Sequence, residues 1–217
     1  MDYLNKYWLL RLKNCEQALK RNHFDATVVE SEAEACWQVL DLISSTLGNG
    51  ESVGFGGSQT VLKSGVYEGL KTCKHLNVID HFDKSLSREQ ALDLRKKAAT
   101  AKLYLTGANA ITETGMLVNL DMLGNRVAAL TIGPQQVVVM AGRNKLVTNL
   151  EAAMSRIKKI AAPANAMCLG METPCASTGY CSDCQSPNRI CNVWTIHEKC
   201  FPAGRIKVFL INADLGL

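Results

Sequence analysis

The chain has 217 residues, of which 47% are apolar and 20% are charged, and its formal net charge is +4. This balance is that of an ordinary globular protein and excludes a disordered chain. The lysines and arginines are dispersed, with short clusters only at residues 95–97 and 158–159 and no aromatic stacking platform beside either. That dispersal argues against a nucleic-acid-binding protein.

Two features of the sequence concern the location of the protein. No apolar run approaches the roughly 20 residues that are needed to span a bilayer. The N-terminal segment MDYLNKYWLLRLKNC has no small-residue cleavage site. We therefore expect a cytoplasmic protein without a membrane partner. In that reducing compartment the nine cysteines are expected to be thiols and not disulfides.

The first half of the chain alternates between helical and strand patterns. Ser31 is a good N-cap for the second helix, and Glu34 is its capping-box partner. The predicted elements are a helix over residues 3–21, a strand over 26–29, a helix from Ser31 to Gly48, a strand, glycine-rich turn and helix over 52–70, a strand over 77–80, a helix over 87–99 and a strand over 101–107.

The second half continues this alternation after one polar interruption. The predicted elements are a polar loop over residues 106–125, strands over 126–134 and 135–142, a helix from about Asn149 that Pro163 stops, and a strand over 205–211. Such intervals are typical of parallel β-α-β units. We predict a single α/β domain over residues 1–217, with a mainly parallel sheet flanked by helices. The cysteine-rich segment 164–200 is predicted to be an insertion that folds over the domain, and the last strand is predicted to rejoin the main sheet.

The first candidate site is the glycine-rich turn between a strand and a helix, Gly54–Thr60. Glycines let the backbone approach a ligand closely, and a helix N-terminus favours anions. Gly57, Ser58 and Thr60 are therefore candidates for binding a phosphate or a carboxylate. A plain turn capped by Ser58 explains the same residues equally well. The turn matches neither the dinucleotide fingerprint nor the P-loop, which disfavours NAD and ATP.

The second candidate site is the polar loop, which follows a strand where α/β proteins place ligand-binding loops. Glu113 is the candidate catalytic residue, as a general base or a ligand carboxylate. The alternative is a loop whose Asx and ST turns satisfy its own backbone. The polar turn over residues 142–145 adds Lys145 as a partner for an anionic substrate. The ligand-binding candidates of the loop itself are Gly107, Asn109, Thr112 and Asn119.

Four cysteines form the third candidate site. Cys175, Cys181, Cys184 and Cys191 are separated by five, two and six residues. In a reducing compartment this density favours a metal site over free thiols or a redox pair. Zinc sites usually have two close cysteine pairs, whereas a single close pair with wider flanks fits a [4Fe–4S] cluster better. We favour the cluster, with zinc as the alternative. Three neighbours could replace a ligand: Cys168, His197 and Cys200.

Five motifs together resemble one family. They are GFGGSQT, TGANAITETGMLVNLDMLGNRVAALTIGP, GRNKLV, IAAPANA and TPCASTGYCSDCQSPNRICN, in that order. In this combination the chain resembles the LUD (lactate-utilisation) domain family from about Asp25 to Asn192. The resemblance implies a fold similar to ribose-phosphate isomerases, CoA transferases and 5-formyltetrahydrofolate cyclo-ligase, in which the first glycine turn contacts phosphate or another anion. It also implies a link to the oxidation of lactate to pyruvate, in which larger family members take part through an iron–sulfur, electron-transferring complex.

Three functions remain open from the sequence. The first is an iron–sulfur protein that assists the oxidation of lactate or a similar small hydroxy acid, with a redox partner protein supplying the electron acceptor. The second is an isomerase- or transferase-like enzyme that acts on a small anionic substrate, with Glu113 as acid, base or nucleophile and a structural zinc or iron–sulfur site. The third is a metal-stabilised binding module without chemistry. A homodimer is a further expectation.

Overall fold

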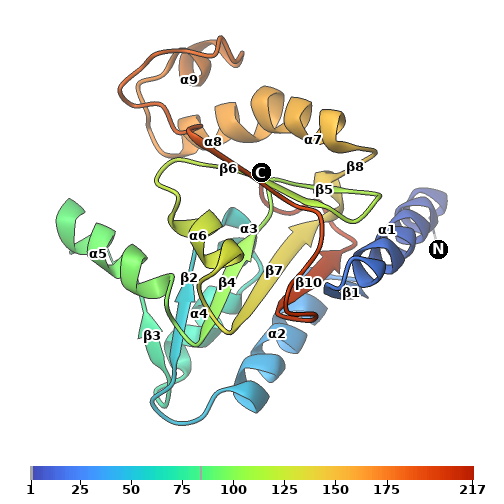
Figure 1. The fold of residues 1–217 in the computed structure, drawn as a ribbon, viewed down its shortest axis with the longest axis vertical. Coiled ribbons are helices and arrows are strands. Elements are labelled where there is room, and N and C mark those ends of the chain that lie inside the picture. Colours follow the sequence, from blue (N-terminus) through green and yellow to red (C-terminus); the bar gives the residue numbers. More distant parts are fainter. Residues whose placement is uncertain (1, 84) are drawn as a thin grey trace.

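Six parallel strands form the main sheet, in the order β1-β10-β7-β4-β2-β3 (Figure 1). The structure is a computed structural model that describes residues 2–83 and 85–217. The strands of this sheet are β1 (Asp25–Val29), β2 (Ser52–Phe55), β3 (Asn77–Ile79), β4 (Leu103–Gly107), β7 (Gln136–Gly142) and β10 (Ile206–Ile211). The helices are α1 (Tyr3–Arg21), α2 (Glu32–Thr46), α3 (Gln59–Lys63), α4 (Val66–Thr72), α5 (Arg88–Ala98), α6 (Asn125–Thr131), α7 (Leu150–Arg156), α8 (Ala162–Cys168) and α9 (Pro174–Thr178).

Alternate side chains of the main sheet point to opposite faces and build two hydrophobic cores. Val137 and Val139 of β7 pack with helices α1, α5 and α6, whereas Val138 and Met140 pack with α2, α3 and α4. Burial on both faces explains why β7 reads as an uninterrupted apolar run. The predicted fold class, an α/β protein with a parallel sheet flanked by helices, is confirmed.

A second, four-stranded sheet was not predicted from the sequence. Its strands, in the order β8-β5-β6-β9, are β8 (Leu146–Val147), β5 (Ala110–Thr112), β6 (Leu117–Asp121) and β9 (Val193–His197). Strand β6 pairs antiparallel with β5 and β9, and β5 pairs parallel with β8. Helix α7 covers this sheet through Ala153, which packs with Ala110 and Val118. In Figure 1 the second sheet lies between the main sheet and the α7–α8 pair.

The cysteine-rich segment is tied to the second sheet by its own strand. Strand β9 pairs with β6, and the backbone N–H of Asn192 donates to the carbonyl of Asp121 at 3.0 Å. After this segment the chain returns to the main sheet, where β10 lies between β1 and β7. The prediction that the last strand rejoins the main sheet is therefore confirmed.

Residues 126–134 form a helix and a turn, so the prediction of a strand there is wrong. Gly124, with a φ of +87°, turns the chain into α6 without a capping side chain of its own. The carboxylate of Asp121 replaces that cap, because its Oδ2 accepts from the N–H groups of Arg126 and Val127 at 3.1 and 3.4 Å. The β-branched residues of this stretch gave a strand pattern that the capped turn overrides.

The sequence predicted that Pro163 stops the helix from Asn149, but the helix continues past it. The chain stays helical from α7 through a π-helical turn, Ile157–Ala161, into α8, which ends at Cys168. Pro163 lies in the first turn of α8, directly after the π-turn. A π-turn changes the backbone hydrogen-bond pattern locally, so the missing N–H of a proline is tolerated there. No helix in the described parts of the chain is long and apolar enough to cross a membrane.

Candidate functional site

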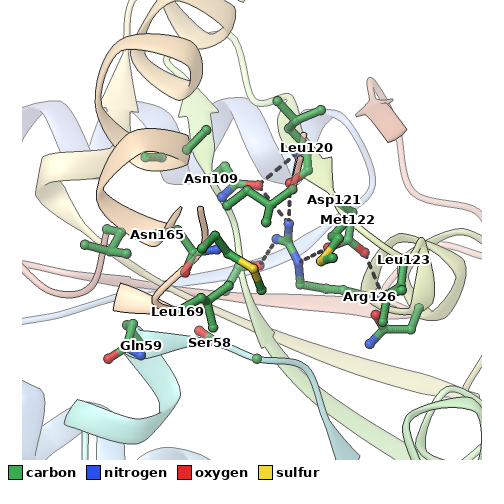
Figure 2. A pocket seen from close by; sticks show the side chains of 18 of the residues that line it. Ser58, Gln59, Asn109, Leu120, Asp121, Met122, Leu123, Arg126, Asn165 and Leu169 are labelled. Carbon is green, nitrogen blue, oxygen red and sulfur yellow. Dashed lines mark hydrogen bonds and ion pairs between the residues drawn. The ribbon is translucent and has the colours of Figure 1, made fainter. Parts of the chain in front are cut away.

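A cavity of about 500 Å³ lies where three neighbouring strands of the main sheet end. Parallel strands place their carboxyl ends at one edge of the sheet, and α/β proteins bind ligands there. Strand β2 leads to Ser58, β4 leads to Asn109, and β7 leads to Lys145, and all three side chains line the cavity. Helix α8 closes the opposite side with Asn165, and Figure 2 shows Asn109, Ser58 and Asn165 from these different elements around the same space.

Lys145 lines this cavity although its side chain is almost fully buried, with 4% exposure. Its Nζ donates to Thr60 Oγ1 at 2.7 Å. Among the described residues no carboxylate lies within ion-pair distance of this amine. Burial, and after it the nearby cations Arg156 and Arg126, together lower the pKa of Lys145 to about 7. An anion in the cavity would offset both effects.

Arg126 is a central residue of the site that the sequence analysis missed. Its Nη1 donates to Asn119 Oδ1 at 2.7 Å and to the Gly107 carbonyl at 3.3 Å. Its Nη2 donates to Asn109 Oδ1 at 2.8 Å and to the Leu120 carbonyl at 3.1 Å (Figure 2). These contacts occupy the guanidinium with protein acceptors, so Arg126 holds the loop in place and is not the main anion ligand.

The network around Arg126 leaves one amide available to a ligand. Asn109 Oδ1 accepts from Arg126 and also from the N–H of Leu120, at 2.9 Å. Two donors therefore fix which end of this side chain is the oxygen. Its Nδ2 makes no hydrogen bond within the described residues, and Asn109 lines the cavity. Asn119, also predicted as a ligand, is fully buried behind this layer and supports Arg126 instead.

Gly107 keeps the space beside Lys145 open. A Cβ at this position would lie 2.7 Å from Ser58 Oγ and 3.5 Å from Lys145 Nζ. Glycine is thus required here by close approach, and its backbone lines the cavity together with Gly57. Four of the predicted ligand residues, Gly57, Ser58, Asn109 and Lys145, are therefore brought together around this one glycine.

Besides Asn119, two predicted ligand residues do not line the cavity themselves. Thr60 contacts it indirectly, through the hydrogen bond to Lys145. Thr112 is fully buried in the β5–β6 turn, where its Oγ1 contacts Thr114 Oγ1 at 2.8 Å and accepts from the N–H of Met116 at 3.0 Å. Thr112 thus follows the alternative that the sequence left open, a turn that satisfies its own backbone.

Glu113 lies apart from the cavity. Its carboxylate pairs with Arg11 of α1, with distances of 2.7 Å from Nε and 2.6 Å from Nη2 to Oε1. Glu113 occupies the turn between β5 and β6, next to Thr112, and the N–H of Glu113 bonds the carbonyl of Val147 on β8. The structure therefore does not bring the predicted acid–base residue together with the predicted ligand residues. Its visible role is to dock α1 against the second sheet.

Two further cations on α5 line the cavity, and neither was singled out from the sequence. Arg88 is exposed, Arg95 is half-buried, and neither forms an ion pair within the described residues. Asp121 is the acidic residue of the lining, and it already pairs with Arg126 at 3.5 Å. The cavity thus carries an excess of positive charge. Apolar residues complete the wall: Leu62, Phe82, Leu92, Met122, Leu123, Leu169, Met171 and Ile190.

The four predicted metal cysteines line a second, much smaller cavity of about 10 Å³, together with Thr173 and Arg189. They come from α9 and from the irregular chain that follows it. All nine cysteines of the described chain are free thiols. The four cysteines line the same cavity although they are spread over residues 175–191. The structure therefore gathers the predicted donor set around one space.

Two cations lie next to these thiols. Lys158 Nζ is 4.0 Å from Cys191 Sγ, and Arg189 donates to the carbonyls of Cys184 and Cys191 at 2.6 and 3.0 Å. Burial raises the pKa of the Cys191 thiol, while Lys158 and Arg189 oppose that shift. Such cations suit a site of several thiolates, which carries negative charge when it holds a metal.

The donor set suits a metal, but the thiols are not closed around one. Within residues 2–83 and 85–217, no three His, Cys, Asp or Glu side chains are arranged to hold a metal ion. The cysteines would therefore have to change position to bind an ion or a cluster. Cys200 is buried elsewhere and donates to the Pro202 carbonyl at 3.2 Å, and Cys168 contacts Gln59 of the first cavity at 3.5 Å. Neither of these two cysteines lines the small cavity.

The two cavities share a wall. Ala162, in the first turn of α8, and Ile190, just before Cys191, line both of them. A metal among the thiols would therefore be separated from a ligand in the larger cavity by one layer of side chains. This proximity joins two candidate sites that the sequence placed in separate segments.

These features describe an α/β protein with a cationic ligand cavity at the ends of parallel strands and a four-cysteine site behind it. The chain belongs to the LUD domain family, whose family model matches residues 12–211. The recognition made from the motifs is therefore confirmed. Among curated proteins there is no significant match to the chain.

Two solved structures are similar to the chain. One is the crystal structure of a DUF162 family protein from Deinococcus radiodurans, with 12% sequence identity, a TM-score of 0.49, and coverage of 95% of this chain and 98% of that chain. The other is the crystal structure of eIF2B delta from Chaetomium thermophilum, with 17% identity, a TM-score of 0.34, and coverage of 54% of this chain and 50% of that chain. At these TM-scores neither likeness carries an argument about the site.

Proposed function

We propose that this LUD-domain protein binds the anion of a small hydroxy acid such as lactate in the larger cavity and a [4Fe–4S] cluster at Cys175, Cys181, Cys184 and Cys191. In this proposal it assists the oxidation of the acid together with a redox partner protein. The single observation that supports it best is the wall shared by the two cavities at Ala162 and Ile190. A purely structural metal would have no need to lie beside the ligand.

The charge of the larger cavity supports an anionic ligand. Lys145 is buried without a carboxylate partner among the described residues, and burying an unpaired charge is costly. A ligand carboxylate would pair with Lys145 and accept from Asn109 Nδ2 and the Ser58 hydroxyl. Arg88 and Arg95 would attract the anion toward the cavity by long-range electrostatics.

The chemistry assigned to the chain is limited to binding and electron transfer. Oxidation of a hydroxy acid to its oxo acid releases two electrons and two protons. An iron–sulfur cluster, when bound, transfers electrons one at a time. The partner protein is therefore assigned the hydride acceptor, which takes both electrons and one proton, while the second proton goes to solvent. This chain holds the anion, and a bound cluster would carry electrons one at a time from the reduced acceptor to a terminal acceptor on the partner protein. Glu113 has no part in this scheme, and a Glu113→Gln variant is expected to leave anion binding unchanged.

A second candidate is an isomerase- or transferase-like enzyme acting on a small anion, with a structural zinc or iron–sulfur site. The observation that favours it is Lys145, an amine with a pKa of about 7 inside the cavity. Such a group can exchange a proton with a substrate at neutral pH. In that case the metal would only hold residues 175–191 against α8.

Metal content is the first test, and it separates the first candidate from the zinc form of the second. The protein is purified without oxygen, and its iron, sulfide and zinc contents and visible spectrum are measured. We expect about four irons and four sulfides per chain and a broad band that dithionite bleaches, as for a cubane cluster. Cys181→Ser and Cys191→Ser variants should lose most of the iron, whereas the control Cys73→Ser, outside the small cavity, should keep it. One zinc without colour would favour the second candidate, and a metal-free protein would contradict both metal assignments.

A further inference from the structure

The Lys145 amine lines the cavity and has more bonding capacity than the binding of an anion requires. Its Nζ can donate three hydrogen bonds, and one of them goes to Thr60. We infer that Lys145 is a nucleophile that condenses with the carbonyl carbon of a small 2-oxo acid to form an imine. This inference rests on the proposed function only for the class of ligand, since oxidation of a 2-hydroxy acid yields a 2-oxo acid.

Two glycines lie against Nζ, so no side chain covers the amine on those two sides. Gly107 lies on one side, where an added Cβ would stand 3.5 Å from Nζ. Gly216 lies on another, where an added Cβ would stand 3.1 Å from Nζ and 2.3 Å from Thr60 Oγ1. Two glycines from distant parts of the chain thus pack against one amine. Any larger side chain at position 107 would crowd the cavity side, where the ligand has to approach.

The charges that face Lys145 keep part of the amine neutral, which imine formation requires. The groups are Arg156, from the end of α7, and Arg126, from α6, and Asp121 is engaged by Arg126. Thr60, from α3, contributes only a hydroxyl. Burial and these two cations lower the pKa of Lys145 to about 7. Desolvation and a neighbouring cation are the known physical means by which a lysine becomes nucleophilic at neutral pH.

The cavity also offers donors for the carboxylate of the same ligand. Asn109 Nδ2 and the Ser58 hydroxyl face it from the ends of β4 and β2, and Asn165 faces it from α8 (Figure 2). None of these hydrogen atoms is used by an acceptor within the described residues. A 2-oxo acid has its carboxylate directly beside its carbonyl, so one molecule can use these donors and place its carbonyl carbon at Nζ.

The proposed step is balanced without an oxidant or a reductant. The neutral amine attacks the carbonyl carbon, a C–N bond forms, and the carbonyl oxygen takes up protons and leaves as water. The product is an imine, and water reverses the reaction. The imine nitrogen becomes protonated. The protonated imine withdraws electrons from the carbon atoms bonded to the former carbonyl carbon.

Reductive trapping with pyruvate tests this inference. The anaerobically purified protein is incubated with pyruvate and cyanoborohydride at neutral pH, and the modified residue is located by peptide mass spectrometry. We expect one adduct per chain, on Lys145. Lys145→Arg should lower its yield at least tenfold, whereas the control Lys159→Arg, an exposed residue nearby, should not change it. The mapping in the unaltered chain does not depend on whether the variant folds.

Pyruvate binding is measured in parallel, as protection against thermal unfolding. This measurement distinguishes a failure of the imine inference from a failure of the proposed anion site. Binding without an adduct, or adducts spread over surface lysines, would overturn the imine and leave the anion site standing. No binding and no adduct would overturn the imine together with the anion site. Lactate, which has no carbonyl carbon to attack, should compete with adduct formation without forming one.

Discussion

If the cavity binds an anion as proposed, Lys145 should make that binding depend on pH. The charged amine pairs with an anion, and its pKa in the free protein is about 7 because of burial and the neighbouring arginines. The affinity for lactate should therefore be constant below about pH 7 and fall by up to tenfold per pH unit above it. Isothermal titration from pH 6 to pH 9 measures this dependence. Lys145→Arg, which stays charged, is the matched comparison, and an equal fall in that variant would assign the effect to another group.

Arg126 is the residue whose loss should cost the most stability in the site. Its side chain is 8% exposed, and it serves two side-chain and two backbone oxygens besides Asp121. Removing one partner of a buried charged network leaves the others unsatisfied. We expect Arg126→Met to lower the free energy of unfolding by roughly 3–5 kcal/mol.

Urea denaturation measures this change, with Arg88→Met as the control. Arg88 lines the same cavity from an exposed position and forms no ion pair within the described residues. Its replacement should change stability by less than about 0.5 kcal/mol. Equal stabilities of the two variants would contradict the assignment of Arg126 as a support of the loop.

At the scale of elements, the sequence predicted those parts whose pattern is local. The long helix α1, the apolar strand β7 and the Ser87-capped helix α5 follow from periodicity and capping residues, and Ser87 forms the complete capping box with Gln90. The second sheet could not be predicted in this way. Its strands have two to five residues, and they are stabilised by pairing between segments as distant as β6 and β9.

In the candidate site, too, the sequence predicted the residues with a local pattern and missed those whose position depends on packing. Glycines and polar residues after strands predicted Gly57, Ser58, Gly107, Asn109 and Lys145 as ligand-binding residues, and the structure places all five in the lining of one cavity. Arg126 was missed because its segment was read as a strand. The signal that was present is the spacing from Asp121 to Gly124, an acidic cap followed by a glycine turn. The cations of α5 could not be found, because their approach depends on how a surface helix packs.

Gly124 offers a test of the turn that starts α6. Its φ is +87°, and an added Cβ would meet nothing within 4 Å, so a substitution would strain only the backbone. Gly124→Ala should lower the free energy of unfolding by about 1–2 kcal/mol. Gly57→Ala is the matched control, since it too has open space but no positive φ. Gly57→Ala should leave stability unchanged or raise it slightly, because alanine lowers the entropy of the unfolded chain. An equal loss of stability in Gly57→Ala would contradict the assignment of the loss to the positive φ of Gly124.

At the scale of the whole molecule, the shared wall predicts coupling between the two cavities. Ala162 and Ile190 line both cavities, so a metal that changed the positions of the thiols would also move the lining of the larger cavity. We expect removal of the metal by a chelator to weaken lactate binding about fivefold, the low end of typical couplings between sites. Calorimetry on loaded and stripped protein measures it. Reciprocity requires lactate to raise the affinity for the metal by the same factor, and an unchanged lactate affinity would mean that the sites are independent.

The anchoring of the cysteine-rich segment has a consequence for how the chain can change in length. Asn192 bonds to Asp121 and Met122, and the register of β9 on β6 places Val193 opposite Asp121. The short stretch from Ile190 to Val193 therefore connects the wall shared by the two cavities to the β6–β9 strand pair, whose register is fixed. Added or deleted residues there would shift Asp121 and the start of α6. Residues 176–180, between the first two cysteines, pair with no strand. Natural or engineered variation in length should therefore be confined to that stretch.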